Sequence, residues 1–232
     1  MIITRLEHGW SWRIPLPDGR MSIGVVLDRS AAEALGATSE DRLVAAIQRD
    51  PYLSEAVASA KRVSSVKSYA NYQLVSEQAF GPGWVQLGDA YGFVDPMLSP
   101  GLFMAMKSAS ILADIFIRYP DGPPLRALRG YQRKFDDWLE AWTELIELFY
   151  DGRIFSLQAA GEKIMQMHSN PVALLLQRHM NSHIACMAAG AWTTRAYSRH
   201  LLQFSSKHLI WGVDPAGRRA ITKLNHFVRC LT

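Results

Sequence analysis

The residues best suited to chemistry lie in the segment GDAYGFVDPMLSPGLFMAMKSA, which begins at Gly88. Asp89 ends a short apolar run, where a carboxylate is costly unless hydroxyl or N–H groups donate hydrogen bonds to it. Gly88 has no Cβ, so the backbone there can approach a ligand closely. A sugar-like polyol supplies the donors that Asp89 requires.

A helix expected to begin at Gly101 adds a second binding element. Its first N–H groups are unpaired and lie at the positive end of the helix dipole, which favours an anion or an electron-rich carbonyl. The pairs Asp95-Pro96 and Ser99-Pro100 stiffen the intervening loop and limit the entropy lost when a ligand docks. The segment therefore predicts a ligand with a polyol arm and an electron-rich ring edge.

The first part of the chain, residues 1 to about 90, alternates like strands. HGWSWRIPL and RMSIGVVLD flank the turn Pro17-Asp18-Gly19, which indicates a hairpin. VSSVKSYANYQLVSEQAF is typical of one long strand or of two with a bend, and WVQLG of a short buried strand. Two short helices are expected on either side of the boundary at Pro51.

The rest of the chain reads as helix. After the helix from Gly101 to about Tyr119, large apolar residues recur every seven positions, which predicts a buried helical seam. These residues are Leu128, Phe135, Trp142 and Phe149. Further helices are predicted over 153–168, 171–189 and 191–208, and the tail from Trp211 is ambiguous.

The segment from Gly88 resembles the GD motif of FAD-dependent monooxygenases of the p-hydroxybenzoate-hydroxylase type. Within that superfamily it is most similar to the flavin-dependent halogenases and their close oxidoreductase relatives, whose motif reads G-D-A-A-x-F-x-D-P-x-x-S-x-G-x-x-x-A. The run Trp10-Ser11-Trp12-Arg13-Ile14-Pro15 matches the W-x-W-x-I-P signature of that branch, and GPGWVQLGDA also resembles it. The resemblance covers roughly residues 8 to 118.

This resemblance implies FAD as the cofactor. Asp89 would bond its ribityl or pyrophosphate region, and the loop from Asp95 to Leu102 would lie under the isoalloxazine. The implied cofactor-binding residues are Gly88, Asp89, Ala90, Asp95, Pro96, Ser99, Gly101 and Leu102. Trp10 and Trp12 are candidates for the substrate side, with core packing as the other interpretation. No catalytic side chain is assigned.

The expected fold class is α/β (α+β), as a fragment of a flavoprotein. Residues 1–83 would form antiparallel strands and short helices of the substrate domain, and 84–120 the last strand and helix of the FAD-binding domain. Residues 121–232 would form an all-helical region. Because the chain has no GxGxxG motif, it resembles the C-terminal half of such an enzyme: a truncated gene product, a split-gene subunit or an incomplete gene model.

The expected function is that of an FAD-dependent oxidoreductase, monooxygenase- or halogenase-like, acting on a small-molecule substrate. A flavin reductase, or a separately encoded N-terminal FAD-binding half, would be its partner. The resemblance also implies a halide site next to the Ser-x-Gly segment. Here its middle residue is Pro100, which has no N–H to donate, so Ser99 and Gly101 remain but the implication of halide binding is weakened. Two alternatives stay open: a flavin-dependent reductase of prenyl or other C=C bonds, and a non-catalytic helical interaction module.

Composition argues against several other classes of protein. The net charge of +4 comes from scattered basic residues, so no nucleic-acid partner is expected. The sequence has no uninterrupted apolar stretch of the roughly 20 residues that a membrane span needs, so none is expected. It has two cysteines without motif spacing, which favours a location in the reducing cytoplasm. His179 and His183 have the i, i+4 spacing of metal ligands, but no third ligand joins them, so no metal site is expected.

Overall fold

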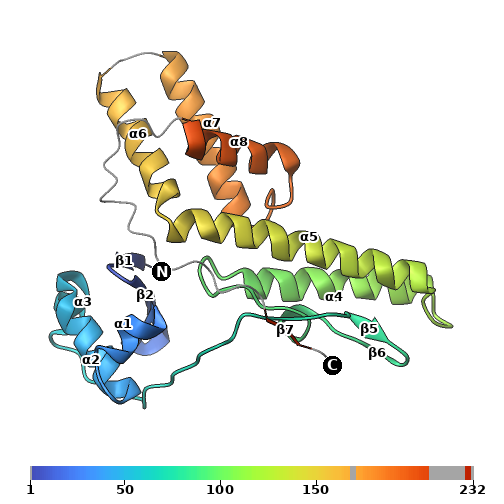
Figure 1. Cartoon of the computed structure of the whole chain (residues 1–232), viewed down its shortest axis with the longest axis horizontal. Coiled ribbons are helices and arrows are strands. Elements are labelled where there is room, and N and C mark those ends of the chain that lie inside the picture. Colours follow the sequence, from blue (N-terminus) through green and yellow to red (C-terminus); the bar gives the residue numbers. More distant parts are fainter. Residues whose placement is uncertain (1, 168–170, 209–227, 231–232) are drawn as a thin grey trace. The chain divides into compact units, whose positions relative to one another are not determined.

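The computed structural model of the chain describes residues 2–167, 171–208 and 228–230 (Figure 1). They belong to two compact units, Met1–Ala70 and Asn71–Thr232, and each unit is described by itself. The ambiguous tail from Trp211 lies outside the described residues except for 228–230. The finer segment boundaries that the resemblance implies stay predictions.

The first unit contains a three-stranded antiparallel sheet in the order β1-β2-β3. Its strands are β1 (Ile2–Leu6), β2 (Gly9–Pro15) and β3 (Met21–Leu27). The predicted hairpin is therefore confirmed. In its register Trp12 lies opposite Gly24, and a Cβ on Gly24 would come within 2.1 Å of the indole ring. Glycine at position 24 thus leaves room for the Trp12 side chain to lie across the sheet.

Three helices complete this unit: α1 (Arg29–Glu33), α2 (Ser39–Arg49) and α3 (Pro51–Val57). A capping box between Thr38 and Asp41 begins α2, and the Asp50 side chain accepts a hydrogen bond from the first turn of α3. The two predicted helices around Pro51 are confirmed. The five-residue α1 had no periodic pattern long enough to predict it.

The strands of the second unit are short: β4 (Leu74–Ser76), β5 (Phe80–Gly81), β6 (Trp84–Val85) and β7 (Val228–Cys230). Of the two interpretations of residues 63–80, one long strand is wrong and two strands are confirmed only in part, because within this range strands form only at β4 and β5. WVQLG is a strand only at β6, which pairs with β5. The predicted all-helical region also contains an exception, since β7 pairs with β4 in parallel.

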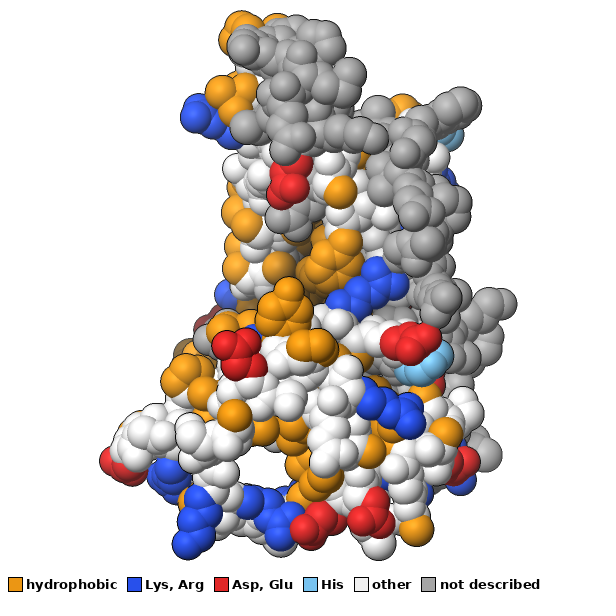
Figure 2. All heavy atoms as spheres, turned by 90° about the vertical axis from the view of Figure 1, so that its left-hand side faces the viewer, with side chains coloured by type: hydrophobic (Ala, Val, Ile, Leu, Met, Phe, Trp, Pro, Cys, Tyr) orange, Lys and Arg blue, Asp and Glu red, His pale blue; other side chains and the backbone are white. Residues whose placement is uncertain are grey.

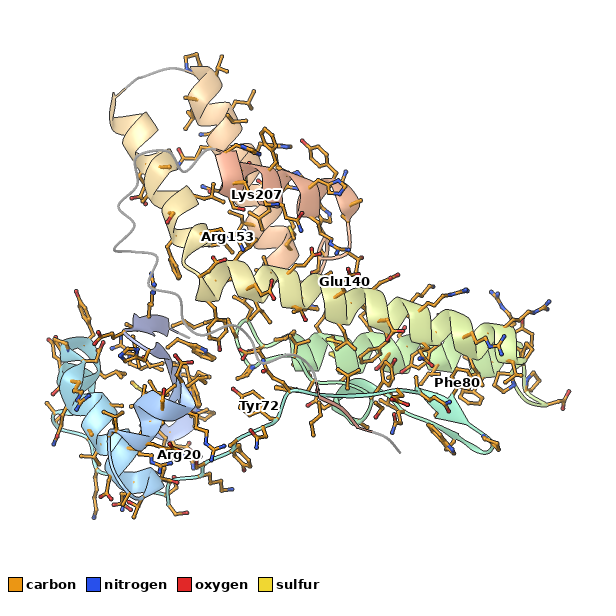
Figure 3. The ribbon with its side chains drawn as sticks, in the orientation of Figure 1. Arg20, Tyr72, Phe80, Glu140, Arg153 and Lys207 are labelled. Atoms are coloured by element: carbon orange, nitrogen blue, oxygen red, sulfur yellow. The ribbon has the colours of Figure 1, made fainter. Side chains whose placement is uncertain are left out.

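Within the part of the second unit that the structure describes, five α-helices follow the strands, and Figure 1 shows α4 and α5 side by side. They are α4 (Pro100–Arg118), α5 (Leu125–Tyr150), α6 (Arg153–Met167), α7 (Pro171–Ala188) and α8 (Ala196–His208). The predicted seam on α5 is confirmed: Phe135, Trp142 and Leu145 are at most 1% exposed. Arg199 of α8 binds Glu144 on α5 at 2.8 Å and also lies 3.5 Å from Glu140, which Figure 3 labels.

One face of α4 is apolar and uncovered by the described residues. Leu102, Met106, Phe116 and Ile117 are 72%, 66%, 46% and 79% exposed; we call them the α4 stripe. By length and composition, α4 is the helix among the described residues that could cross a membrane. Its opposite face packs on α5 and on the turn at Gly88, as in a core helix with one open side. The absence of a membrane span stays a prediction.

Charged side chains on the face shown in Figure 2 occur in small mixed groups, with Lys and Arg near Asp, Glu and hydrophobic side chains. Exposed ion pairs such as Arg29–Glu33 contribute at most about 1 kcal/mol each. The dispersion on this face agrees with the scattered basic residues of the sequence.

Candidate functional site

The predicted site begins at a 3₁₀ turn, Gly88–Ala90, which follows β6. Gly88 is buried with φ +54°, and a Cβ there would lie 3.0 Å from the Cβ of Ala105 on α4. Its N–H donates to Ser108 Oγ on the same helix at 3.0 Å. The close backbone approach that Gly88 permits is therefore to α4.

Asp89 lies on this turn and is exposed. The expectation of a carboxylate at the end of a buried strand is wrong, since the chain turns before Asp89. A Cβ on Gly101 would lie 3.1 Å from Asp89 Oδ1, so the carboxylate sits beside the first turn of α4. Among the described residues none donates a hydrogen bond to Asp89. Its oxygens are thus available to a ligand.

The N-terminus of α4 is uncapped by its own N-cap side chain. Ser99 occupies the N-cap position with φ 56° and ψ 47° and makes no capping hydrogen bond. Pro100 has no N–H, and the N–H groups of Gly101 and Leu102 lack intrahelical partners. Donors at the positive end of the helix and the acceptor oxygens of Asp89 therefore lie side by side.

The buried carboxylate of the site is Asp95, which is 2% exposed. Met97 N–H donates to its Oδ1 at 2.8 Å, and Tyr150 OH lies 3.0 Å from its Oδ2. Burial raises the pKa of Asp95 to about 6, although these two hydrogen bonds favour its ionised form. No motif in the sequence predicts this contact with Tyr150, which is 55 residues away along the chain.

A cavity of about 320 Å³ opens beside the loop. Its lining residues are Leu98, Ser99, Leu102, Phe103, Met106, Trp142, Ala188 and Ala189. Ser99 and Leu102 were predicted site residues, and the others were missed. The i, i+4 spacing of Leu102 and Met106 is a usable signal for this wall, whereas the seven-residue recurrence assigns Trp142 to core packing. An uncharged, largely apolar group fits such walls.

Gly190 controls one wall of the cavity. Its φ is +83°, and a Cβ there would lie 2.5 Å from the Phe103 ring. Gly190→Ala is expected to lower the free energy of unfolding by about 3 kcal/mol, since backbone strain and a clash add. Gly83 is the matched control, because it has φ +77° and open space around it. Gly83→Ala should cost about 1 kcal/mol in urea unfolding; equal losses would show that the clash is relieved.

The structure brings Gly88, Asp89 and Gly101 together at the first turn of α4. Of the remaining predicted residues in this unit, Ala90 is exposed on the turn and Pro96 is half-buried in the loop. Trp10 is 4% exposed, and its ring lies 5.7 Å from that of Trp12, in the first unit. The placement of the tryptophans on the substrate side stays a prediction.

His179 and His183, on α7, both contact side chains of α8. His183 Nδ1 lies 2.9 Å from Ser198 Oγ, and His179 Nε2 lies 3.0 Å from Tyr197 OH. The described residues contain no group of three side chains that could hold a metal ion. The two histidines thus serve helix packing in the arrangement observed.

Protonation of His183 should destabilise the fold. Burial lowers the pKa of His183, and the charges of His179 and Arg195 lower it further. Below the ordinary value of 6.5 the unfolded chain binds the proton more readily than the folded chain, so the free energy of unfolding falls as the pH drops. We expect His183→Gln to reduce this dependence in urea unfolding at pH 7.5 and 5.5; an unchanged pH dependence in that variant would contradict the assignment to His183.

Comparison with known proteins gives several related matches. The tryptophan halogenase family model matches residues 3–192. A tryptophan 2-halogenase of Chondromyces crocatus is 28% identical over 154 residues, 64% of this chain and 30% of the relative. A flavin-dependent halogenase of Penicillium aethiopicum is 31% identical over 107 residues, 44% of this chain and 20% of the relative. The chain thus spans less than a third of the length of either curated relative.

Among solved structures, a flavoprotein/dehydrogenase from Cytophaga hutchinsonii is similar, with a TM-score of 0.71 and 20% identity. The match covers 88% of this chain and 48% of the other, and at this identity it shows a shared fold. The family model reaches across most of the chain, including the turn at Asp89, the loop to Gly101 and helix α4. The chain therefore belongs to the tryptophan halogenase family.

Proposed function

We propose that this chain forms the ribityl and ring end of the FAD site in a halogenase-like, flavin-dependent oxidoreductase. The observation that carries the proposal is the carboxylate of Asp89, without a hydrogen-bond partner among the described residues, beside the uncapped start of α4. The flavin dependence stated for the Penicillium relative supports this choice of cofactor.

The residues present fit this end of a flavin. Asp89 would accept hydrogen bonds from ribityl hydroxyls, and Gly101 leaves space there because a Cβ would lie 3.1 Å from Asp89 Oδ1. The first N–H groups of α4 would donate to the pyrimidine edge of the ring. Bound flavin would supply the redox chemistry, and the chain would supply placement and electrostatics. The neighbouring apolar cavity would receive part of a small-molecule substrate.

The α4 stripe would be the contact surface for a separately encoded FAD-binding half, which would hold the adenosine end of the cofactor. Four large apolar side chains, 46% to 79% exposed along one helix, favour such a partner. A flavin reductase would be a further, transient partner.

Flavin titration of the purified chain, read by flavin fluorescence, tests the proposal. Since the proposed contacts address only the ribityl and ring end, riboflavin, FMN and FAD should bind with similar affinity. Binding of FAD alone would point to adenosine contacts elsewhere in the chain. A lack of binding by all three, with and without an added FAD-binding half, would contradict the proposal.

Flavin titration together with measurement of oxygen consumption separates the alternatives. A non-catalytic interaction module would take up no flavin. If flavin binds, oxygen consumption that depends on halide indicates a halogenase, and oxygen consumption independent of halide indicates a hydroxylase. If the flavin-bound protein shows neither activity, a flavin-dependent reductase of C=C bonds is favoured.

A further inference from the structure

The carboxylate of Asp95 is buried without a cation. It is 2% exposed, and the ion pairs among the described residues involve other carboxylates. A buried charge without a counter-ion is costly unless hydrogen bonds compensate for the lost hydration. The role proposed for Asp95 must therefore explain why a carboxylate is buried here at a cost in free energy.

The hydrogen bonds of Asp95 join two parts of the second unit. Its Oδ1 accepts from Met97 N–H at 2.8 Å, two residues along the loop. Tyr150 OH, at the last residue of α5, lies 3.1 Å from Oδ1 and 3.0 Å from Oδ2. Ser99 N–H continues the turn by donating to Pro96 O at 2.9 Å. The carboxylate of Asp95 thus stabilises the turn within the loop and also connects the loop to α5.

The loop held in this way has a strained backbone. Leu98 and Ser99 have φ values of 64° and 56°, in the left-handed region that non-glycine residues rarely adopt. Such residues persist only where the surrounding structure holds them. Both line the cavity, and Ser99 directly precedes the first residue of α4.

We propose that Asp95 is a positioning residue: through Tyr150 and Met97 N–H it holds the loop from Asp95 to Gly101 closed, and it does not itself contact the ligand. The identity of that ligand rests on the proposed function, whereas the state of the loop does not. This assignment replaces the direct cofactor contact that the resemblance implies for Asp95. Its burial, with both oxygens engaged, is the reason.

The closed loop should respond to pH. The titratable groups that face Asp95 are two phenols, Tyr150 and Tyr72, the latter labelled in Figure 3. Burial, with the charge of Asp95 as a second cause, raises the pKa of Tyr72 to about 12, so Tyr72 stays neutral near pH 6. Asp95 is therefore the group that titrates there.

The direction of this pH effect on the loop follows from the burial of Asp95. In an open, solvated loop the carboxyl would return toward its ordinary pKa of 3.8, whereas in the closed loop the pKa is about 6. The closed loop thus binds the proton more tightly. Raising the pH from about 4 to above 6 favours opening, by on the order of 100-fold for a difference of about two pKa units.

Amide hydrogen exchange, measured by NMR on the ligand-free chain and corrected for the intrinsic rate at each pH, tests this. The reporters are the N–H groups of Met97 and Ser99, and the control is Gly122 N–H, which donates to Tyr119 O in another loop. We expect the protection of the reporters to fall on the order of 100-fold between pH 4 and 7. The protection of Gly122 should stay constant.

Three variants distinguish a positioning role from general loosening. Asp95→Asn, which is neutral at every pH, should make protection independent of pH. Tyr150→Phe removes a hydrogen bond that lowers the pKa of Asp95, so protection should be lower at pH 7 and its fall should extend to higher pH. Tyr131→Phe is the matched control, because Tyr131 is on the same helix and donates to Gln86 O. It should follow the wild type.

Flat protection in the wild type, a pH dependence that survives Asp95→Asn, or the same shift in Tyr131→Phe would overturn the proposal. If the chain binds riboflavin, Asp95→Asn should bind it at least as tightly as the wild type at pH 7. A tenfold loss would show that Asp95 contacts the ligand. If no flavin binds at all, the proposed function fails, but the exchange experiment still decides the role of Asp95.

Discussion

Asp89→Ala is expected to weaken riboflavin binding about 10- to 100-fold, because hydrogen bonds to a charged group contribute about 1.5–3 kcal/mol each. The Asp89 side chain is exposed and takes no hydrogen bond from the described residues, so its removal leaves no protein group unpaired. Fluorescence titration of riboflavin gives the affinities. Thermal unfolding should show a change below about 1 kcal/mol, which reflects the lost charge at the start of α4.

Asp114→Ala is the control for this variant. Asp114 is also an exposed carboxylate, within α4, but it lies 13 residues beyond Gly101, about 20 Å along the helix. Its removal changes the net charge equally and should leave the affinity unchanged. Equal losses in both variants would mean that only the overall charge matters, and would remove Asp89 from the site.

Phe135→Ala should produce the largest loss of stability, about 3–5 kcal/mol. Phe135 is fully buried on α5, and its ring lies 5.0 Å from that of Tyr91 and 6.1 Å from that of Trp138. The cavity created by the substitution would remove the contact between α5 and Tyr91, which directly follows the turn that carries Asp89. Urea unfolding followed by circular dichroism measures the change, with Phe204→Ala as control, since Phe204 is 60% exposed. A loss below 1 kcal/mol at Phe135 would indicate that the seam collapses to fill the space.

The helices could be predicted from the sequence because their signals are local. The seven-residue recurrence through Phe135 and Trp142 fixes the buried face of α5, and Pro51 and Pro100 mark helix starts. The prediction over 63–80, one strand or two with a bend, was confirmed only at β4 and β5, for a different reason. A strand needs a partner for its backbone, and the sequence could not show that β4 pairs with residues about 150 positions away.

In the candidate site, too, local features could be predicted and features that depend on distant residues could not. The motif located Asp89 and Gly101, which the structure places together at the first turn of α4. It could not separate the roles of the two carboxylates, because burial depends on the tertiary contacts of Asp95 with Tyr150. The cavity walls from Trp142 and Ala188 likewise depend on helix packing, which no motif at this loop encodes.

The left-handed residues Leu98 and Ser99 restrict how this protein can be engineered. Glycine at either position would relieve backbone strain, and a search for thermostable variants would favour it on that ground. The same change would remove a side chain from the cavity wall and allow the loop more conformations. Selection for heat resistance at these two positions would therefore proceed at the expense of the binding surface, a trade-off between durability and function set by two backbone angles.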